Sequence, residues 1–244
     1  MMSELLTRGI SAYKRKGLAY LGYATTREAY RAIKRPILLE YYRTLQSSSK
    51  FEFRGQNYSY LYTPATVHWP GPNERSVEVP IFERMVRDAA DKRILEVGNV
   101  LHHHMSHSHD VVDKYEKADG VWNEDAVDFR GKEAYDLIVS ISTLEHVGFD
   151  EPVIDAEKIP RAFANLKSNL KPGGLLVASM PVGYNAALDH NLREGILPLS
   201  ARYCLKRISA NNKWIETNWD EIKNAAYDKP YPYANALVIV EVQN

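Results

Sequence analysis

The sequence predicts an α/β fold with a doubly wound, mostly parallel sheet, and three observations support this prediction. From Glu74 onward, short apolar runs typical of strands alternate with amphipathic helical segments. The run 135–142 is apolar almost throughout, as in a strand that is buried on both faces. A helical stripe with spacings of four, three and four residues follows, formed by Ile159, Phe163, Leu166 and Leu170.

The chain divides into three predicted segments. Residues 1–50 form a basic helical extension, which glycines and Pro36 interrupt. Residues 51–73 form a β-hairpin that turns at Gly55-Gln56-Asn57, followed by a loop that caps the main domain. Residues 74–244 form the main domain and contain all the strands of the predicted sheet.

Seven strands are expected in the main domain, the last of them antiparallel. They are Arg93–Val97, Asp110–Tyr115, Gly120–Trp122, Tyr135–Ser142, Leu175–Met180, Arg202–Ser209 and Ala236–Val242. One helix is predicted over Val77–Ala89, and the helix with the apolar stripe is predicted to end at Lys171-Pro172-Gly173-Gly174. Only 12 residues, 99–110, precede the core of the second strand, so the first crossover helix is short or absent.

The composition of the chain limits its expected cellular location and its expected binding partners. Cys204 is the only cysteine, which excludes an internal disulfide and favours a reducing, cytoplasmic location. The sequence contains no run of 18 apolar residues, so we expect no transmembrane helix, and the N-terminus lacks the pattern of a signal peptide. Residues 1–50 carry ten basic and three acidic side chains, which suits either peripheral contact with an anionic membrane or a solvated face. No nucleic-acid-binding motif is present, so we expect no nucleic acid partner.

Polar residues follow the ends of the first three predicted strands. Glu96 and Gly98 end the first strand, Asp113 ends the second, and Asp125 follows the third. In a doubly wound sheet, ligands bind beyond the carboxyl ends of the strands, where the strand order reverses. A carboxylate there can accept both hydroxyl hydrogens of a ribose, or an adenine amine, and Gly98 lets the backbone approach a ligand.

The motifs EVG, LEHVG and LKPGG, taken in this order, resemble the class I S-adenosylmethionine-dependent methyltransferases over residues 75–244. The segments NERSVEVPI, EVGNVL, HDVVDKYEKADG and PVGYN also look like uncharacterised methyltransferases associated with polysaccharide biosynthesis. The resemblance implies a Rossmann-like fold, S-adenosylmethionine as cofactor, and a set of residues that contact it. These are Glu96, Gly98, Asn99, Asp113, Asp125, Ala126 and Ser142.

A small-molecule acceptor, with a hydroxyl on a sugar or related metabolite, is the expected substrate. His146 follows the fourth strand, and an imidazole with an ordinary pKa of about 6.5 suits a general base. Three residues after the fifth strand, Tyr184, Asn185 and Asp189, are predicted to bind this substrate.

Two other functions stay open at this stage. Val100 stands where the family commonly has a second glycine, which favours a degenerate protein that binds a ligand or partner without catalysis. A dinucleotide oxidoreductase is disfavoured, because no G-x-G-x-x-G motif follows the first strand. The five histidines between His102 and His109 suggest a metal site, but we expect them to form a polar loop over the cofactor and expect no metal.

Overall fold

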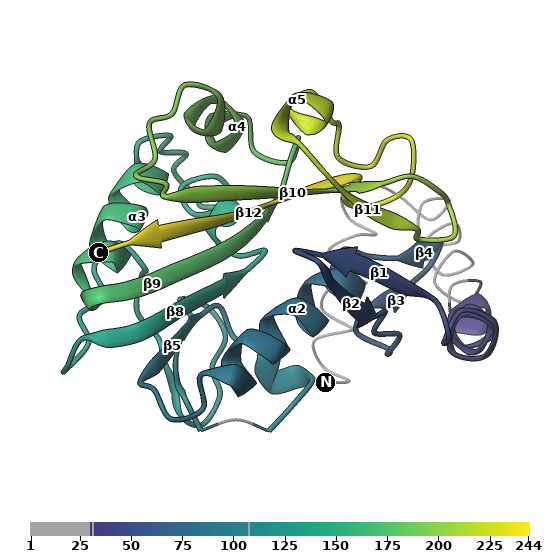
Figure 1. The fold of residues 1–244 in the computed structure, drawn as a ribbon, viewed down its shortest axis with the longest axis horizontal. Helices are drawn as coiled ribbons and strands as arrows, with labels where there is room; N and C mark the ends of the chain where they lie inside the picture. The colour runs from purple at the N-terminus through teal and green to yellow at the C-terminus, as the bar shows by residue number, and fades with distance from the viewer. Residues whose placement is uncertain (1–29, 31, 107) are drawn as a thin grey trace, which may run out of the picture.

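The computed structural model describes residue 30, residues 32–106 and residues 108–244. Its main feature is an eight-stranded sheet with the strand order β11-β10-β12-β9-β8-β5-β6-β7 (Figure 1). The strands are β5 (Ile94–Val97), β6 (Asp110–Val112), β7 (Val121–Trp122), β8 (Tyr135–Ile141), β9 (Leu170–Pro181), β10 (Ala201–Arg207), β11 (Trp214–Thr217) and β12 (Ala236–Gln243).

The strand order reverses beside β5. From β5 the chain adds β6 and then β7 on one side, and it then crosses to the other side to add β8 and β9. All of these neighbours are parallel, whereas β12 runs antiparallel to both β9 and β10. The structure therefore confirms the doubly wound, mostly parallel sheet with an antiparallel last strand. Its switch point lies at the carboxyl ends of β5 and β8.

The sheet has one strand more than the seven predicted. The additional strand, β11, pairs antiparallel with β10 at the edge of the sheet, from Cys204 opposite Thr217 to Arg207 opposite Trp214. Trp214 is buried, but the next two side chains are exposed. The strand therefore lacks the alternation of buried and exposed residues by which a strand is recognised in a sequence.

Helices cover both faces of the sheet, and each face has its own apolar core (Figure 1). The helices are α2 (Arg75–Asp88), α3 (Lys158–Ser168), α4 (Ala186–Arg193) and α5 (Trp219–Ile222). The first core contains α3, α4 and α5, and the second contains α2 and aromatic residues of the hairpin. Because side chains alternate along a strand, Val238 of β12 faces the first core and Leu237 faces the second.

Both predicted helices of the main domain are present, as α2 and α3, but α3 ends earlier than predicted. It ends at Ser168, and the segment 171–174 lies inside β9. The register of β9 against β8 shifts between Tyr135 and Leu137, next to this segment. Gly173 has a φ of +77° and its amide donates to the carbonyl of Asn244 at 3.0 Å. The glycines thus form an irregular start of a strand and do not end the helix.

The predicted hairpin consists of β1 (Lys50–Phe53) and β2 (Gln56–Ser59). Its turn lies at Arg54 and Gly55, one residue earlier than predicted, and both residues have positive φ values of 54° and 71°. Two such residues form the type I′ turn that matches the twist of a hairpin. In the loop that follows, β3 (Val67–His68) pairs with β4 (Gly71–Pro72).

The predicted basic extension lies mostly outside the described residues, which exclude 1–29 and 31. Residues 32–45 are helical, as predicted, and Tyr42 is buried in the second core with Phe51 and Phe53 of β1. In the described part of the chain, no helix combines the length and the apolar character needed to span a bilayer.

Candidate active site

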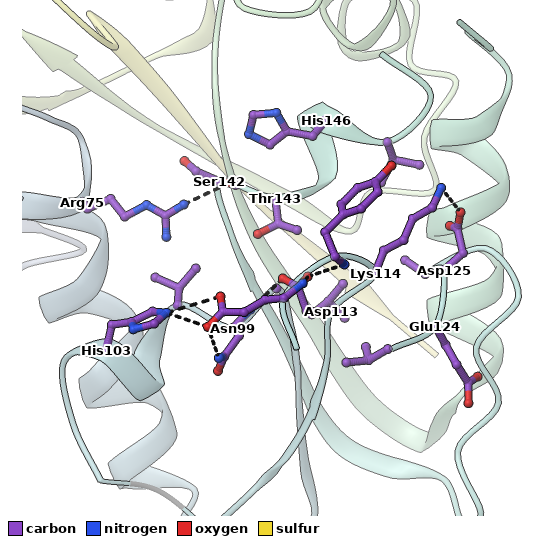
Figure 2. A pocket seen from close by; sticks show the side chains of 18 of the residues that line it. Arg75, Asn99, His103, Asp113, Lys114, Glu124, Asp125, Ser142, Thr143 and His146 are labelled. Carbon is purple, nitrogen blue, oxygen red and sulfur yellow. Dashed lines mark hydrogen bonds and ion pairs between the residues drawn. The ribbon is translucent and has the colours of Figure 1, made fainter. Parts of the chain in front are cut away.

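A cavity of about 600 Å³ lies at the carboxyl ends of β5, β6 and β8, at the switch point of the sheet (Figure 2). Its wall comes from the segments that follow these strands, from Arg75 at the start of α2, and from His103 and His104. The volume falls within the range of about 300–1,000 Å³ that is typical of small-molecule sites. Six predicted site residues lie in its wall together with His146: Gly98, Asn99, Asp113, Asp125, Ala126 and Ser142.

Gly98 forms the floor of the cavity where β5 ends. It has a φ of +88°, a left-handed conformation that favours glycine. A Cβ atom built on Gly98 would lie 2.1 Å from Oγ1 of Thr143, which follows β8. The chain therefore needs glycine here both for its conformation and for the close approach of the two strand ends.

Glu96 does not contact the cavity, which corrects its predicted role as a direct cofactor contact. Its side chain is fully buried, and Oε1 accepts hydrogen bonds from the amides of Val100 and Leu101 at 2.8 and 2.7 Å. Oε2 lies 2.9 Å from Nε2 of His109. Glu96 thus stabilises the loop after β5 by accepting hydrogen bonds from two of its backbone amides. This loop needs an internal acceptor because the crossover contains only the 3₁₀ helix η1 (Leu101–His103).

Asp113 fixes the loop after β6 and lines the cavity. Its Oδ1 accepts from the amides of Tyr115 and Glu116 at 2.8 and 2.7 Å, and its Oδ2 accepts from the amide of Asn99 at 3.2 Å. These bonds tie the loop after β6 to the glycine loop after β5. Each carboxylate oxygen has two lone pairs, so Oδ2 of Asp113 retains the capacity to accept one further hydrogen bond from a ligand.

Asn99 and Glu116 form a second polar pair in the wall. Nδ2 of Asn99 donates to Oε1 of Glu116 at 2.8 Å, and Nε2 of His103 lies 3.0 Å from the same oxygen. Oδ1 of Asn99 is buried and has no hydrogen-bond partner among the described residues. Glu116 was not predicted, although its position three residues after Asp113 puts it in the same loop.

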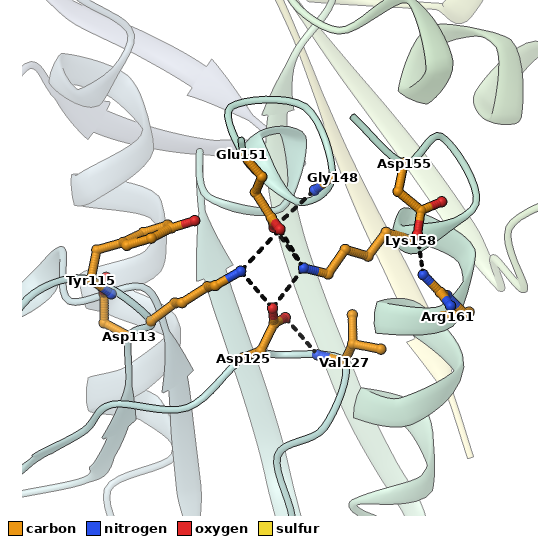
Figure 3. Close-up of polar contacts among 10 residues, drawn as sticks. Asp113, Tyr115, Asp125, Val127, Gly148, Glu151, Asp155, Lys158 and Arg161 are labelled. Atoms are coloured by element: carbon orange, nitrogen blue, oxygen red, sulfur yellow. Dashed lines mark hydrogen bonds and ion pairs between the residues drawn. The ribbon is translucent and has the colours of Figure 1, made fainter. Parts of the chain in front are cut away.

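Asp125 belongs to a network of four charges at one side of the cavity (Figure 3). Its Oδ2 lies 2.8 Å from Nζ of Lys114 and 2.6 Å from Nζ of Lys158, and both lysines also contact Glu151. Burial alone would raise the pKa of Asp125, but hydrogen bonds from the two lysines outweigh it and lower this pKa to about 2. Ala126, the next residue, also lines the cavity.

Ser142 lines the cavity, but its hydroxyl faces the protein. Its Oγ donates to Oε1 of Glu78 at 2.6 Å, and its carbonyl accepts from Nη2 of Arg75 at 3.3 Å. Burial raises the pKa of Glu78 to about 7. The Ser142 hydroxyl is thus engaged by Glu78, and the prediction that Ser142 contacts the cofactor stays a prediction.

His146 lies in the wall of the cavity and is paired with Asp150. Its Nδ1 is hydrogen-bonded to Oδ2 of Asp150, and the Tyr184 hydroxyl donates to the same oxygen at 2.6 Å. Hydrogen bonds from Tyr184 and His146 lower the pKa of Asp150, so its carboxylate is ionised and accepts from both partners. In a neutral ring whose Nδ1 donates, Nε2 carries the free lone pair.

Of the three predicted substrate residues, only Tyr184 lies beside His146, with ring centroids 5.0 Å apart. Asn185 is buried at the start of α4, where its side chain accepts from the amides of Ala187 and Leu188. Asp189 is also buried, and its carboxylate accepts from the amide of Gly183. Asn185 and Asp189 therefore stabilise α4 and its preceding loop, which corrects their predicted contact with a substrate.

The described histidines between His102 and His109 do not converge on one point. His103 pairs with Glu116, whereas His109 pairs with the buried Glu96. His104 lines the cavity, and burial lowers its pKa. Within residues 32–106 and 108–244, no group of three potential ligands is arranged to hold a metal ion, and His107 lies outside these ranges.

The fold and the position of the cavity define a doubly wound α/β protein with a ligand site at the switch point of its sheet. No family model and no curated protein matches the sequence.

Among solved structures, the chain is similar to the N-methyltransferase NodS from Bradyrhizobium japonicum WM9 in complex with S-adenosyl-L-homocysteine. The identity is 16% and the TM-score 0.43, covering 70% of this chain and 88% of that one. It is also similar to the sugar N-methyltransferase KedS8 from Streptoalloteichus sp ATCC 53650, at 14% identity and a TM-score of 0.36, covering 68% and 87%. An S-adenosylmethionine-dependent methyltransferase from Clostridium acetobutylicum ATCC 824 is 12% identical, with a TM-score of 0.34, covering 67% and 89%. Similarity at this level does not assign a ligand or a reaction to this chain.

Proposed function

We propose that the protein is an S-adenosylmethionine-dependent methyltransferase that transfers a methyl group in line to a hydroxyl of a sugar or a related small metabolite. The observation that carries this proposal is the composition of the cavity at the switch point. One part of its wall contains Gly98, Asp113 and Asp125, and another contains His146. The first group suits an adenosine, and the second suits an acceptor that must lose a proton.

The residues in the wall fit the cofactor in shape and in hydrogen-bonding capacity. Gly98 lines the cavity with its backbone, and Oδ2 of Asp113 can accept from a ribose hydroxyl. The unpartnered Oδ1 of Asn99 favours a ligand, because a buried acceptor without a donor costs about 1–3 kcal/mol. An ammonium or hydroxyl of the cofactor would supply that donor.

The protein's part in the reaction is to orient the acceptor and to remove its proton. S-adenosylmethionine supplies a methyl group on a sulfonium, which is already a good leaving group. Asp150 accepts from Nδ1 of His146, which leaves Nε2 to take the proton of an acceptor hydroxyl. Burial and the neighbouring Asp150 raise the pKa of Tyr184, so its phenol stays protonated and keeps Asp150 in place.

One observation favours the second candidate function, a protein that binds a ligand without catalysis. The Asp113 and Asp125 carboxylates already accept from backbone amides and from two lysines, respectively. A ligand must therefore share or displace these donors. Carboxylates that are already hydrogen-bonded in this way also suit a protein that binds its ligand weakly and does not catalyse a reaction.

Turnover separates the two functions. The protein is incubated with S-adenosylmethionine and a panel of sugars and nucleotide sugars, and formation of S-adenosylhomocysteine is followed by mass spectrometry. We expect acceptor-dependent turnover that falls about a hundredfold or more in His146→Ala, the usual contribution of a general base. The exposed His190 gives a matched control, and His190→Ala should leave the rate unchanged. Cofactor binding without turnover would favour the second function, and absence of cofactor binding would refute the first.

A further inference from the structure

The cofactor's methionine end carries a carboxylate, and the described residues of the crossover between β5 and β6 offer no α-helix N-terminus to receive it. A crossover helix between β5 and β6 would direct its free amides at an anion in this position. Here η1, with three residues, is the only helical segment among the described residues of the crossover, and the amides of Val100 and Leu101 donate to Glu96. A side-chain cation must therefore take the place of the helix.

The cations in the cavity wall differ in whether a carboxylate already holds them. His103 is paired with Glu116, and Lys114 is paired with both Asp125 and Glu151. Arg75 makes no ion pair with any residue that the structure describes, and among these residues its one hydrogen bond runs from Nη2 to the carbonyl of Ser142 at 3.3 Å. A guanidinium has five N–H donors, so most of those on Arg75 are available to a ligand.

Arg75 is also well placed and firmly held. It is the first residue of α2, and the two residues that follow it, Ser76 and Val77, are completely buried. Figure 2 shows the Arg75 guanidinium at the opposite side of the cavity from Asp125, with Thr143 between them. An adenosine near Asp125 would direct its methionine end toward Arg75.

The carboxyl groups near Arg75 do not form ion pairs with it. Glu78 accepts from the hydroxyl of Ser142, and Glu74 accepts from the amide of Ala234 at 3.2 Å. Glu145 is almost completely buried, and burial raises its pKa. The Arg75 guanidinium is therefore not held by a carboxylate of the described residues and can bind an anion in the cavity.

We propose that Arg75 binds the α-carboxylate of the cofactor's methionine moiety and replaces the missing crossover helix as its anchor. This inference rests on the proposed function, because it takes S-adenosylmethionine as the ligand. A planar guanidinium suits a carboxylate, since two parallel N–H groups can bind its two oxygens.

Two ligands that differ only at the methionine end test this role by isothermal titration. S-adenosylhomocysteine carries the carboxylate, whereas 5′-methylthioadenosine has the adenosine and the thioether but no amino acid. We expect Arg75→Gln to weaken binding of S-adenosylhomocysteine by about tenfold to a hundredfold, as for loss of a charged hydrogen-bonded pair. Binding of 5′-methylthioadenosine should change by less than about twofold, which also shows that the variant is folded. Arg75→Lys should retain part of the discrimination.

Arg84→Gln is the matched control, because Arg84 lies on the same helix but outside the cavity and pairs with Asp88. It should leave both affinities unchanged. Equal losses for the two ligands in Arg75→Gln, or no loss for either, would overturn the assignment of Arg75 and leave the proposed function intact. A wild-type protein that binds neither ligand would overturn both.

Discussion

Replacing Gly98 by alanine adds one methyl group at the point where the segment after β5 contacts Thr143 of the segment after β8. The positive φ of Gly98 costs alanine about 1 kcal/mol. The new Cβ would also lie 2.1 Å from Oγ1 and 2.8 Å from Cγ2 of Thr143, so Thr143 must move. Thr143 then loses the hydrogen bond from Oγ1 to the carbonyl of Ile141, worth about 1 kcal/mol, and overpacking costs about 1–3 kcal/mol more. We expect Gly98→Ala to lower the free energy of unfolding by about 3–5 kcal/mol in total.

The substitution Gly195→Ala separates the cost of the positive φ from the cost of the contact with Thr143. Gly195 has a similar φ of +67°, but a Cβ atom there would meet nothing within 4 Å. Gly195→Ala should therefore cost only the conformational part, about 1 kcal/mol. Both variants are unfolded in urea and followed by circular dichroism, and Thr143→Ala is added to Gly98→Ala to relieve the contact.

The two outcomes are easily told apart. If the contact with Thr143 is real, Gly98→Ala loses more stability than Gly195→Ala, and Thr143→Ala recovers part of the difference. Equal losses in the two single variants, with no recovery in the double variant, would refute the close approach of β5 and β8 at the cavity floor.

Two further predictions concern titratable groups. The native pKa of Glu78 is raised to about 7, so between its ordinary pKa of 4.5 and about 7 the native state keeps a proton that the unfolded chain loses. Stability therefore falls as pH rises through this window, by about 3 kcal/mol, and Glu78→Gln should be more stable than wild type at pH 8 but not at pH 4 in thermal melts. Asp150→Asn should lower turnover about tenfold or more with little change in cofactor affinity, because an amide does not hold Nδ1 of His146 as a carboxylate does. The variant should also show an altered pH–rate profile.

A Glu78→Gln variant whose advantage does not grow between pH 4 and pH 8 would show that the carboxyl is not held neutral in the native state. For Asp150, the contrary result is an unchanged rate and an unchanged pH profile at saturating substrate, which would mean that His146 is not oriented by this carboxylate.

The fold was largely predictable because alternating apolar runs are local signals. The strands from β5 to β9 and the antiparallel β12 follow from runs of buried residues. Features that depend on pairing with distant parts of the chain, or that lack a typical residue pattern, were not predicted. The edge strand β11 has one fully buried residue, and the hairpin turns at Arg54 although arginine is not a turn signal. The segment 171–174 has the composition of a helix end, but its place in β9 depends on pairing with β8.

The site was predictable where a residue's place follows from the end of a strand. This holds for Gly98 and Asp113, which come directly after parallel strands, and for Asp125, which follows β7 by three residues; all three lie at one edge of the sheet. It does not hold for Asn185, which was predicted to bind the substrate but caps the N-terminus of α4, a position that favours asparagine.

Polar contacts between residues far apart in the sequence were not predictable. Lys158 meets Asp125 across 33 positions of the chain, and Arg75 reaches Ser142 across 67. No spacing rule in a sequence encodes pairs of this kind, because they depend on how α2 and α3 dock on the sheet.

Titration of the protein with S-adenosylhomocysteine, with and without the Asp113 carboxylate, tests the central claim most directly. The wild-type chain should bind one equivalent, and Asp113→Ala should weaken binding about tenfold to a hundredfold, because a hydrogen bond to a charged group contributes about 1.5–3 kcal/mol. Asp119→Ala, an exposed change in the same loop, should bind as wild type does. Wild-type protein that gives no heat of binding, or a folded Asp113→Ala variant that binds equally well, would contradict the account.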